Sequence, residues 1–141
     1  MKSDTSINDQ TAANKATVRL LIVDDERDGA TALAKLLQLR GFMVQVVTDS
    51  TLCLAQLEAF KPNMIFLDIA MPKLSGYDLA KQIRLMSEYR EIAIVAISGY
   101  TDVAHQTRSI ESGCNRHLIK PMELSEIEAV IAHELNKRRQ S

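Results

Sequence analysis

The chain has 141 residues, of which 46% are hydrophobic, so it is long and apolar enough to form one domain with a complete core. Its 17 Lys and Arg residues nearly balance 18 Asp and Glu residues, and a net charge of −1 gives no electrostatic reason for direct binding to nucleic acid or to a membrane surface. No apolar stretch has the length of a membrane-spanning helix or the form of a signal-peptide core, which favours a cytoplasmic location.

Residues 1–17 are polar and show no periodicity, so we expect a disordered tail or a linker there. Residues 18–138 are expected to form the domain, followed by a short C-terminal end at 139–141. Cys53 and Cys114 lack the CxxC spacing and the nearby histidines of a metal or redox site. We interpret them as reduced thiols that fill the core.

Five short apolar runs follow along the chain, rich in Val and Ile and mostly without alternation of polar and apolar residues. This pattern is typical of parallel strands that are covered by helices on both faces. The runs are "VRLLIV" (18–23), "MVQVV" (43–47), "MIFL" (64–67), "IAIVAI" (92–97) and the weaker "HLI" (117–119).

The segments between and after these runs carry apolar residues at helical spacing. The stripes are Ala30, Leu33, Leu36 and Leu37 in the first; Leu54 and Leu57 in the second; Leu79, Ile83 and Met86 in the third; and Leu124, Ile127, Ile131 and Leu135 in the last. Gly41 is expected to end the first helix after Arg40, and Asp49 or Ser50 to cap the second.

The fourth segment, 102–112, is different because Val103 and Ile110 are its only large apolar residues. We therefore expect a weakly anchored helix there. Five successive strand–helix units predict an α/β fold with a parallel sheet and right-handed crossovers. A sheet of this kind places its functional site beyond the carboxyl ends of its strands.

Polar side chains stand at four of these five strand ends. Asp24 and Asp25 follow the first run, Asp68 the third, Ser98 the fourth and Lys120 the fifth. Three carboxylates held close together repel one another, and a hard divalent cation would relieve the repulsion. Together with a backbone carbonyl from the following loop, they suit Mg²⁺ or Mn²⁺, which prefer oxygen ligands.

The remaining groups of this set suit a phosphoryl group. Lys120 supplies a compact positive charge that can pair with Asp68 or with a phosphoryl oxygen, and Ser98 supplies a small hydroxyl donor. A carboxylate such as that of Asp68 can act as a nucleophile and form an aspartyl phosphate, while the cation and the lysine stabilise the developing charge.

Four stretches, "LLIVDDE", "MIFLDIAMPKLSGYDLAKQIR", "AIVAISG" and "LIKP", resemble the receiver domain of bacterial two-component response regulators and hybrid histidine kinases. The resemblance runs from Val18 to about Arg138, with every landmark in order. It implies a doubly wound, flavodoxin-like fold: a five-stranded parallel sheet of order 2-1-3-4-5 with five helices.

The resemblance also implies roles for the residues at the strand ends. Asp68 takes the place of the phosphoacceptor. Asp25 resembles the direct Mg²⁺ ligand, Asp24 the ligand that acts through water, and the backbone carbonyl of Ala70 completes the protein ligands.

On the same resemblance, Ser98 stands for the switch hydroxyl and Lys120 for the lysine that contacts the phosphate. The Lys120–Pro121 peptide bond is expected to be cis.

Two positions depart from the family pattern. His117 stands three residues before Lys120, where the family usually has the Tyr or Phe of its rotamer switch, so the switch could depend on pH through the imidazole. Ala70 stands where polar residues are frequent. We expect that Ala70 does not help to position a hydrolytic water and that Tyr100 partly screens the site, so that self-dephosphorylation is slow.

The implied function is that of a phosphoprotein in phosphorelay signal transduction. The expected partners are a histidine kinase or a phosphotransfer domain upstream, and an effector protein or an attached output or kinase domain downstream. A small phosphodonor is an alternative source of the phosphoryl group. Apart from its own phosphorylation and dephosphorylation, the domain is not expected to be an enzyme. Whether it stands alone or belongs to a longer regulator or hybrid kinase stays open.

Two other classes of function fit the sequence less well. A phosphatase or phosphotransferase with haloacid-dehalogenase-like chemistry also uses an aspartyl phosphate, but it needs a second acid at the position of Ala70. A flavodoxin-like cofactor binder needs a loop that cradles phosphate after the first strand, and the acidic "VDDERDG" would repel phosphate there.

Overall fold

The computed structural model describes residues 17–139, so almost all of the predicted tail at 1–17 lies outside the described residues. Five parallel strands form one sheet in the order β2-β1-β3-β4-β5, as the resemblance implied. Their bounds are β1 (Arg19–Val23), β2 (Met43–Val47), β3 (Met64–Asp68), β4 (Ala93–Ser98) and β5 (Arg116–Ile119).

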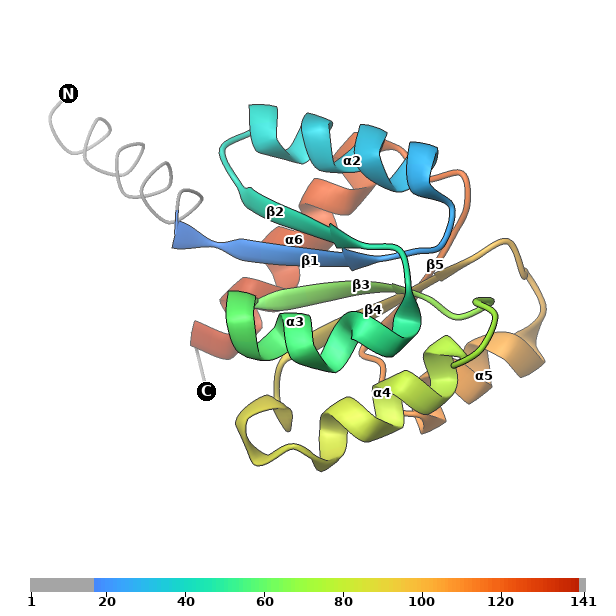
Figure 1. Cartoon of the computed structure of the whole chain (residues 1–141). Coiled ribbons are helices and arrows are strands. Elements are labelled where there is room, and N and C mark those ends of the chain that lie inside the picture. The colour runs from blue at the N-terminus through green and yellow to red at the C-terminus, as the bar shows by residue number, and fades with distance from the viewer. Residues whose placement is uncertain (1–16, 140–141) are drawn as a thin grey trace, which may run out of the picture.

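The described part of the chain contains five α-helices, which confirms the expected number. They are α2 (Arg27–Leu39), α3 (Cys53–Phe60), α4 (Gly76–Leu85), α5 (Val103–Glu111) and α6 (Leu124–Arg139), with two short 3₁₀ helices, η1 (Ser50–Leu52) and η2 (Ser87–Tyr89). Figure 1 shows α2 and α6 on one face of the sheet and α3, α4 and α5 on the other. The sheet is therefore the middle layer of three.

The core has two parts, one on each face of the sheet. One apolar cluster joins the sheet to α2 and α6, with Leu37 and Ile131 as fully buried members. The other joins it to α3 and α4, with Leu57 and Ile83 fully buried. Every residue of β3 is buried, which explains why "MIFL" shows no alternation: a central strand has no face in water.

The helix ends lie near the predicted positions. Helix α2 is followed by Arg40 and then Gly41, whose φ of 101° lies in the left-handed region that favours glycine. Before α3, the side chain of Asp49 accepts a hydrogen bond from the Thr51 N–H and caps η1, whereas Ser50 is buried. Asp49 is thus the capping residue of the two that were considered.

One expectation about a buried helix face is wrong in detail. Leu36 is 47% exposed, and the buried stripe of α2 consists of Ala30, Ala34 and Leu37. A helix turns by about 100° per residue, and in α2 this rotation points Leu37 at the sheet and leaves Leu36 half in solvent.

In α5, Val103 and Ile110 are 75% and 52% exposed, so neither anchors the helix. Its buried residue is Ser109. The contact between α5 and the sheet therefore involves a polar side chain.

The start of α4 lies against the end of β3. A Cβ atom on Gly76 would come within 2.4 Å of the Asp68 carbonyl oxygen and 2.5 Å of the Ile69 Cα, so only glycine fits. Ser75 caps the helix by accepting the Asp78 N–H. Together these contacts hold the start of α4 against the end of β3, so the loop after Asp68 stays close to the strand.

Cys53 and Cys114 are buried free thiols, as predicted, and burial raises the pKa of each to about 12. Neither is a reactive nucleophile. Within residues 17–139, no helix has both the length and the apolar character that a membrane crossing requires.

Candidate functional site

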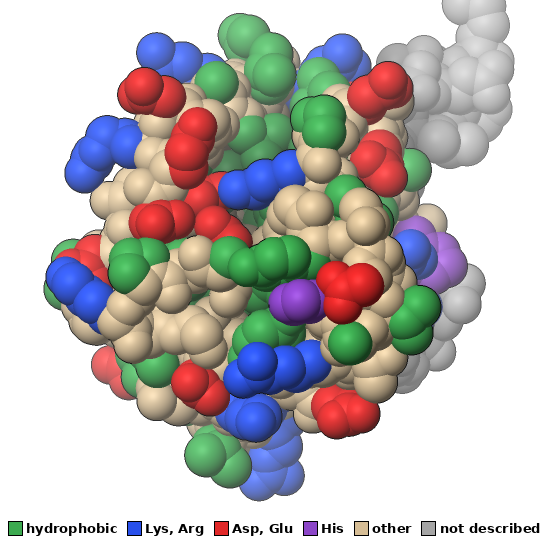
Figure 2. All heavy atoms as spheres, turned by 90° about the vertical axis from the view of Figure 1, so that its right-hand side faces the viewer, with side chains coloured by type: hydrophobic (Ala, Val, Ile, Leu, Met, Phe, Trp, Pro, Cys, Tyr) green, Lys and Arg blue, Asp and Glu red, His purple; other side chains and the backbone are tan. Residues whose placement is uncertain are grey.

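The predicted site residues meet at one edge of the sheet. Asp68 and Ser98 are the last residues of β3 and β4, Asp24 directly follows β1, and Lys120 directly follows β5. Because all strands run parallel, their carboxyl ends lie on the same side of the molecule. Figure 2 shows acidic side chains gathered beside a basic one near the middle of this face.

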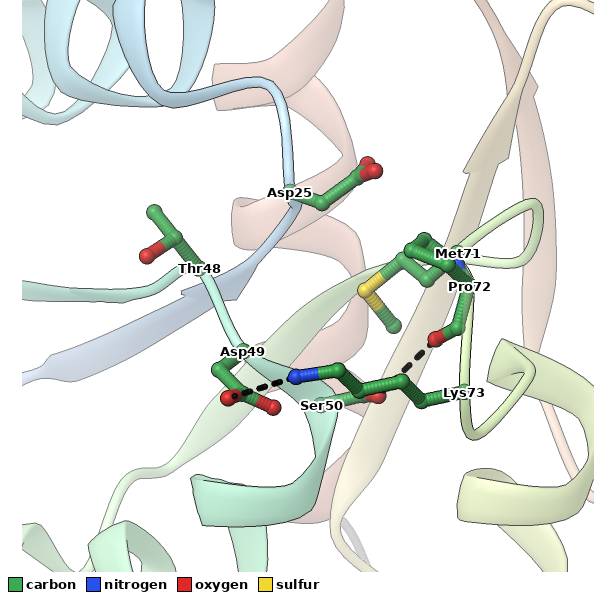
Figure 3. Close-up of a pocket in the computed structure, with 7 residues that line it drawn as sticks. All are labelled: Asp25, Thr48, Asp49, Ser50, Met71, Pro72 and Lys73. Atoms are coloured by element: carbon green, nitrogen blue, oxygen red, sulfur yellow. Dashed lines mark hydrogen bonds and ion pairs between the residues drawn. The ribbon is translucent and has the colours of Figure 1, made fainter.

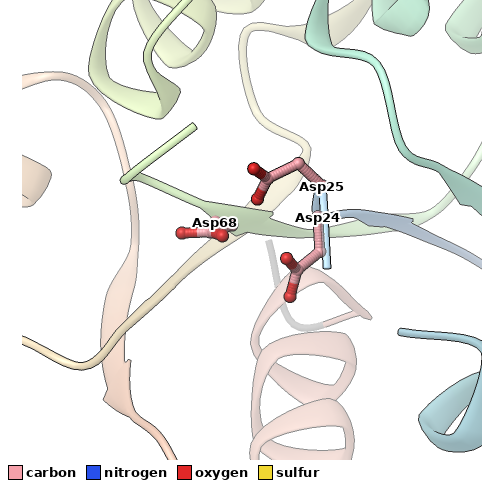
Figure 4. Close-up of side chains that lie close together, drawn as sticks. All are labelled: Asp24, Asp25 and Asp68. Carbon is pink, nitrogen blue, oxygen red and sulfur yellow. The ribbon is translucent and has the colours of Figure 1, made fainter. Parts of the chain in front are cut away.

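Three carboxyl groups form the acidic part of the site. Oxygen atoms of Asp24, Asp25 and Asp68 lie within 4.8 Å of one another (Figure 4). Asp24 and Asp68 are buried, whereas Asp25 is exposed. Like charges at this separation destabilise one another, and the burial of Asp24 and Asp68 limits the screening of these two by water.

Lys120 supplies the positive charge. Its Nζ lies 2.9 Å from Asp24 Oδ2 and 3.7 Å from Asp68 Oδ2. Burial alone would lower the pKa of the lysine, but the hydrogen bond to Asp24 and the charge of Asp68 outweigh burial and raise it. Lys120 is therefore a permanent ammonium ion, with Asp24 as its closer partner.

The surroundings of Asp68 raise the pKa of its carboxyl group. Burial and the nearby Asp24 raise its pKa to about 6, although the Ala70 N–H, which donates to Asp68 Oδ1 at 2.9 Å, and the charge of Lys120 oppose this rise. Ala70 itself is exposed, two residues beyond the strand. Asp68 is thus a buried carboxylate at neutral pH, held by one backbone donor and one ammonium group.

The donor set fits a hard divalent cation. Three carboxylates face a single lysine, so negative charge remains uncompensated when all are ionised. In the part of the chain that the structure describes, no side chain pairs with the Asp25 carboxylate. Oxygen-rich sites with excess negative charge are those that Mg²⁺ and Mn²⁺ prefer.

A hollow of about 110 Å³ adjoins the acidic cluster. It lies between Asp25 and the loops 48–50 and 71–73 (Figure 3). Lys73 crosses its rim to pair with Asp49 at 3.4 Å, and the Ser50 hydroxyl donates to the Pro72 carbonyl at 3.4 Å. Asp25 thus lies both in the acidic cluster and on the wall of an open recess.

Ser98 and His117 are in direct contact. Ser98 Oγ lies 3.1 Å from His117 Nε2 and also accepts the Tyr100 N–H at 3.1 Å. On its other side the imidazole meets Ser109 of α5, with Nδ1 2.8 Å from Oγ. Ser109 belongs to no motif, and its eight-residue spacing from His117 gives no signal of this contact, so the sequence did not predict it.

Tyr100 lies beside this group on the exposed loop after β4. Its ring stacks on His105 of α5, with centroids 3.9 Å apart. The Lys120–Pro121 bond is cis, as expected.

Comparisons with known proteins agree with this geometry. The profile of the response regulator receiver domain family matches residues 20–132. The transcriptional regulatory protein PrrA of Mycobacterium leprae is 31% identical over 120 residues, which are 85% of this chain and 51% of that protein. Response regulator MprA of Mycobacterium ulcerans is 27% identical over 111 residues, 79% of this chain and 47% of that protein. The chain thus spans about half the length of these relatives.

Solved structures show the same fold. A response regulator from Chloroflexus aurantiacus has a TM-score of 0.80 at 27% identity, covering 84% of this chain and 98% of that one. The receiver domain of a histidine kinase from Syntrophus aciditrophicus has a TM-score of 0.80 at 22% identity, covering 89% of this chain and 95% of that one.

Proposed function

Because this chain belongs to the response regulator receiver domain family, we propose that it is a phosphorylation-controlled signalling domain of a two-component system in which Asp68 accepts the phosphoryl group. The observation that carries the proposal is the buried carboxyl of Asp68, which has two further carboxyl groups within 4.8 Å and Lys120 Nζ at 3.7 Å. Burying an acid beside two others costs free energy, which favours a functional role for this carboxyl group.

The reaction on Asp68 is an acyl phosphate synthesis. A carboxylate oxygen of Asp68 forms a bond to phosphorus, the bond from phosphorus to the donor's leaving atom breaks, and the leaving group departs with that electron pair. The pKa of about 6 leaves Asp68 ionised at neutral pH, as a nucleophile requires.

Asp25, Asp24, Asp68 and the Ala70 carbonyl would hold a divalent cation. Bound there, Mg²⁺ or Mn²⁺ would neutralise charge on the phosphoryl oxygens. Lys120 would move from Asp24 to a phosphoryl oxygen, a short displacement because its ammonium group already lies between Asp24 and Asp68. Ser98 would donate its hydroxyl to another phosphoryl oxygen.

The partners follow from the family. We propose a histidine kinase or a phosphotransfer domain as phosphodonor, with residues 18–138 as the receiving domain in the cytoplasm. Of the named relatives, PrrA is a transcriptional regulatory protein and MprA a response regulator, and one similar structure is the receiver domain of a histidine kinase. Phosphorylation would switch the face formed by α5, β5 and α6, which an effector or an attached domain would read. The dehalogenase-like alternative gains no support, because Ala70 has no carboxyl group.

The phosphorylated form is proposed to be long-lived. Ala70 has no polar side chain to orient a water for attack on the aspartyl phosphate. Replacing it by an acid or amide, Ala70→Glu or Ala70→Gln, is therefore expected to shorten the lifetime of the phosphorylated protein. Measuring loss of label after removal of the phosphodonor checks this, and an unchanged or longer lifetime in both variants would contradict it.

The central test is reaction with a small phosphodonor. With Mg²⁺ and acetyl phosphate, the protein should gain one phosphoryl group in intact-mass spectra, and Asp68→Asn should gain none. Asp28→Asn is the matched control, because Asp28 is an exposed acid in the first turn of α2 and should leave labelling unchanged. Equal labelling of the protein and Asp68→Asn would overturn the proposal.

A further inference from the structure

A chain of three hydrogen-bonded side chains runs from the sheet edge to α5. It starts at Ser98, the last residue of β4, passes through His117 of β5 and ends at Ser109. The two links measure 3.1 Å and 2.8 Å. Ser98 and Ser109 are buried, so these groups depend on one another for hydrogen bonds.

The positions of the hydrogens follow from counting donors and acceptors. Ser98 Oγ already accepts the Tyr100 N–H, and in residues 17–139 the only acceptor in reach of its own hydrogen is His117 Nε2. Ser109 donates to the His105 carbonyl at 3.1 Å, so its oxygen is available to accept from His117 Nδ1. Both requirements are met by one form of the imidazole: neutral, with hydrogen on Nδ1.

The opposite tautomer would leave a buried group unsatisfied. With hydrogen on Nε2, both neighbours of Ser98 Oγ would be donors, and the hydroxyl hydrogen would have no partner. Burial also lowers the pKa of His117, which keeps the ring neutral at physiological pH. The groups facing it have opposing effects, since a backbone hydrogen bond with Tyr100 and the charge of Asp102 raise the pKa, whereas His105 lowers it.

We propose that His117 is a positioning residue that holds the Ser98 hydroxyl hydrogen away from the phosphoryl site, and that the Ser98–His117–Ser109 chain is how α5 detects phosphorylation. The inference rests on the proposed function of Asp68. Ser98 has a single hydrogen, which it can give either to His117 Nε2 or to a phosphoryl oxygen.

When Ser98 turns to the phosphoryl group, His117 Nε2 loses its donor. The imidazole must then change tautomer or move, and a shift of hydrogen to Nε2 turns Nδ1 into an acceptor. Ser109 would have to donate to Nδ1 and release the His105 carbonyl within α5. A Phe in place of His117 would have no acceptor for Ser98 and could transmit nothing by this route.

The first test reads the tautomer directly. In ¹⁵N spectra of the imidazole at pH 7.5, unphosphorylated protein should show His117 neutral with hydrogen on Nδ1. In Ser109→Ala this preference should weaken, because Nδ1 loses its acceptor. A protein with hydrogen on Nε2, or with a charged ring, would overturn the proposal, whatever the behaviour of Asp68.

The second test measures the competition for Ser98. Removing the acceptor in His117→Phe should tighten binding of beryllofluoride, a phosphoryl mimic, in the presence of Mg²⁺ by about 2- to 10-fold, the worth of one hydrogen bond. Adding Ser98→Ala should abolish the gain. His133→Phe is the control, because His133 is exposed on α6 and should not change the affinity.

Unchanged or weaker binding in a folded His117→Phe protein would overturn the proposal. If that variant does not fold, Ser109→Ala serves in its place and should tighten binding in the same direction by a smaller factor. Failure of the wild-type protein to bind beryllofluoride would instead count against the role of Asp68, and the tautomer experiment separates the two failures.

Discussion

At the scale of single residues, the position of Lys120 between two buried carboxyl groups has a measurable consequence. Removing its charge in Lys120→Met would leave Asp24 and Asp68 facing each other without compensation. Because the lysine is 35% exposed, water screens part of the effect, and we expect a loss of about 1–3 kcal/mol in the free energy of unfolding without divalent cations. Urea denaturation at neutral pH measures this.

Lys73→Met is the matched control for that measurement. Lys73 also pairs with an aspartate, Asp49, but at 3.4 Å and with 66% of its side chain exposed. An exposed pair of this kind contributes little, so the control should change stability by less than about 1 kcal/mol. Equal losses in both variants would mean that the contact between Lys120 and the acidic cluster stabilises the fold no more than an exposed ion pair does.

The raised pKa of Asp68 predicts that the free energy of unfolding depends on pH. Burial raises its pKa to about 6, so between about pH 4 and 6 the folded protein keeps a proton that the unfolded chain has lost. The folded state binds more protons there, and stability falls as pH rises through this window. Asp68→Asn lacks this loss and should be more stable than wild type above pH 6 by about 1–3 kcal/mol, in chelator.

Thermal and urea denaturation from pH 4 to pH 8 check this. The difference between wild type and Asp68→Asn should shrink toward zero near pH 4, and Mg²⁺ at pH 8 should stabilise wild type more than the variant. If the difference in unfolding free energy between wild type and Asp68→Asn did not change with pH, the pKa of Asp68 would not be raised in the folded protein.

At the scale of elements, the contact between α4 and the end of β3 limits the site loop. Because a Cβ on Gly76 would meet the Asp68 carbonyl at 2.4 Å, Gly76→Ala must push the helix away from the strand. Backbone does not yield easily, and we expect a loss of about 2–4 kcal/mol in stability and weaker beryllofluoride binding.

Gly99→Ala gives the comparison. It also follows a site strand, but an added Cβ there would meet no atom within 4 Å. Its unfolding free energy should stay within about 0.5 kcal/mol of wild type, as for most exposed substitutions. Coinciding melting curves of the two variants would mean that the close approach of α4 to β3 at Gly76 does not limit stability.

The elements also show which parts of the fold sequence patterns can predict. Strand positions follow from covalent order, because Asp68 and Ser98 directly continue apolar runs and must lie at the sheet edge. The rotation of a short helix does not follow in this way. Helix α5 has few apolar residues, so its orientation depends on Ser109 and His117, a polar contact that no periodicity predicts.

The same limit applies to pairings within the site. From the sequence, Lys120 was expected to pair with Asp68 or with a phosphoryl oxygen, whereas in the structure Asp24 is its closer partner. Which carboxylate lies closer depends on side-chain conformations and on differences below 1 Å, here 2.9 Å against 3.7 Å. Motifs predict the members of the site, while packing decides their contacts.

At the scale of the whole molecule, Arg84 joins three segments on one face of the sheet. From α4 it donates to the carbonyls of Gly113, Tyr89 and Arg90 and to the Asn115 side chain, at 2.9–3.1 Å. Arg84→Ala removes all of these bonds together. We expect a loss of about 2–4 kcal/mol, since each bond contributes roughly 1 kcal/mol and part of the network is exposed.

Arg40→Ala is the control for this prediction. Arg40 makes one exposed ion pair with Glu128 at 3.4 Å and should cost less than about 1 kcal/mol. Chemical denaturation compares the two. If Arg84→Ala were no more destabilising than Arg40→Ala, the α4, η2 and α5–β5 segments would be held by their apolar contacts alone.

The hydrogen bond between Lys120 and Asp24 joins residues 96 positions apart. During synthesis on a ribosome, Asp24 and Asp68 leave the exit tunnel long before Lys120 does. Until β5 arrives, the nascent chain has its acids without the ammonium group between them. If Asp68 accepts a phosphoryl group as proposed, the site for it is therefore complete only after β5 and Lys120 have been made, and a nascent chain that ends before residue 120 would lack the ammonium group.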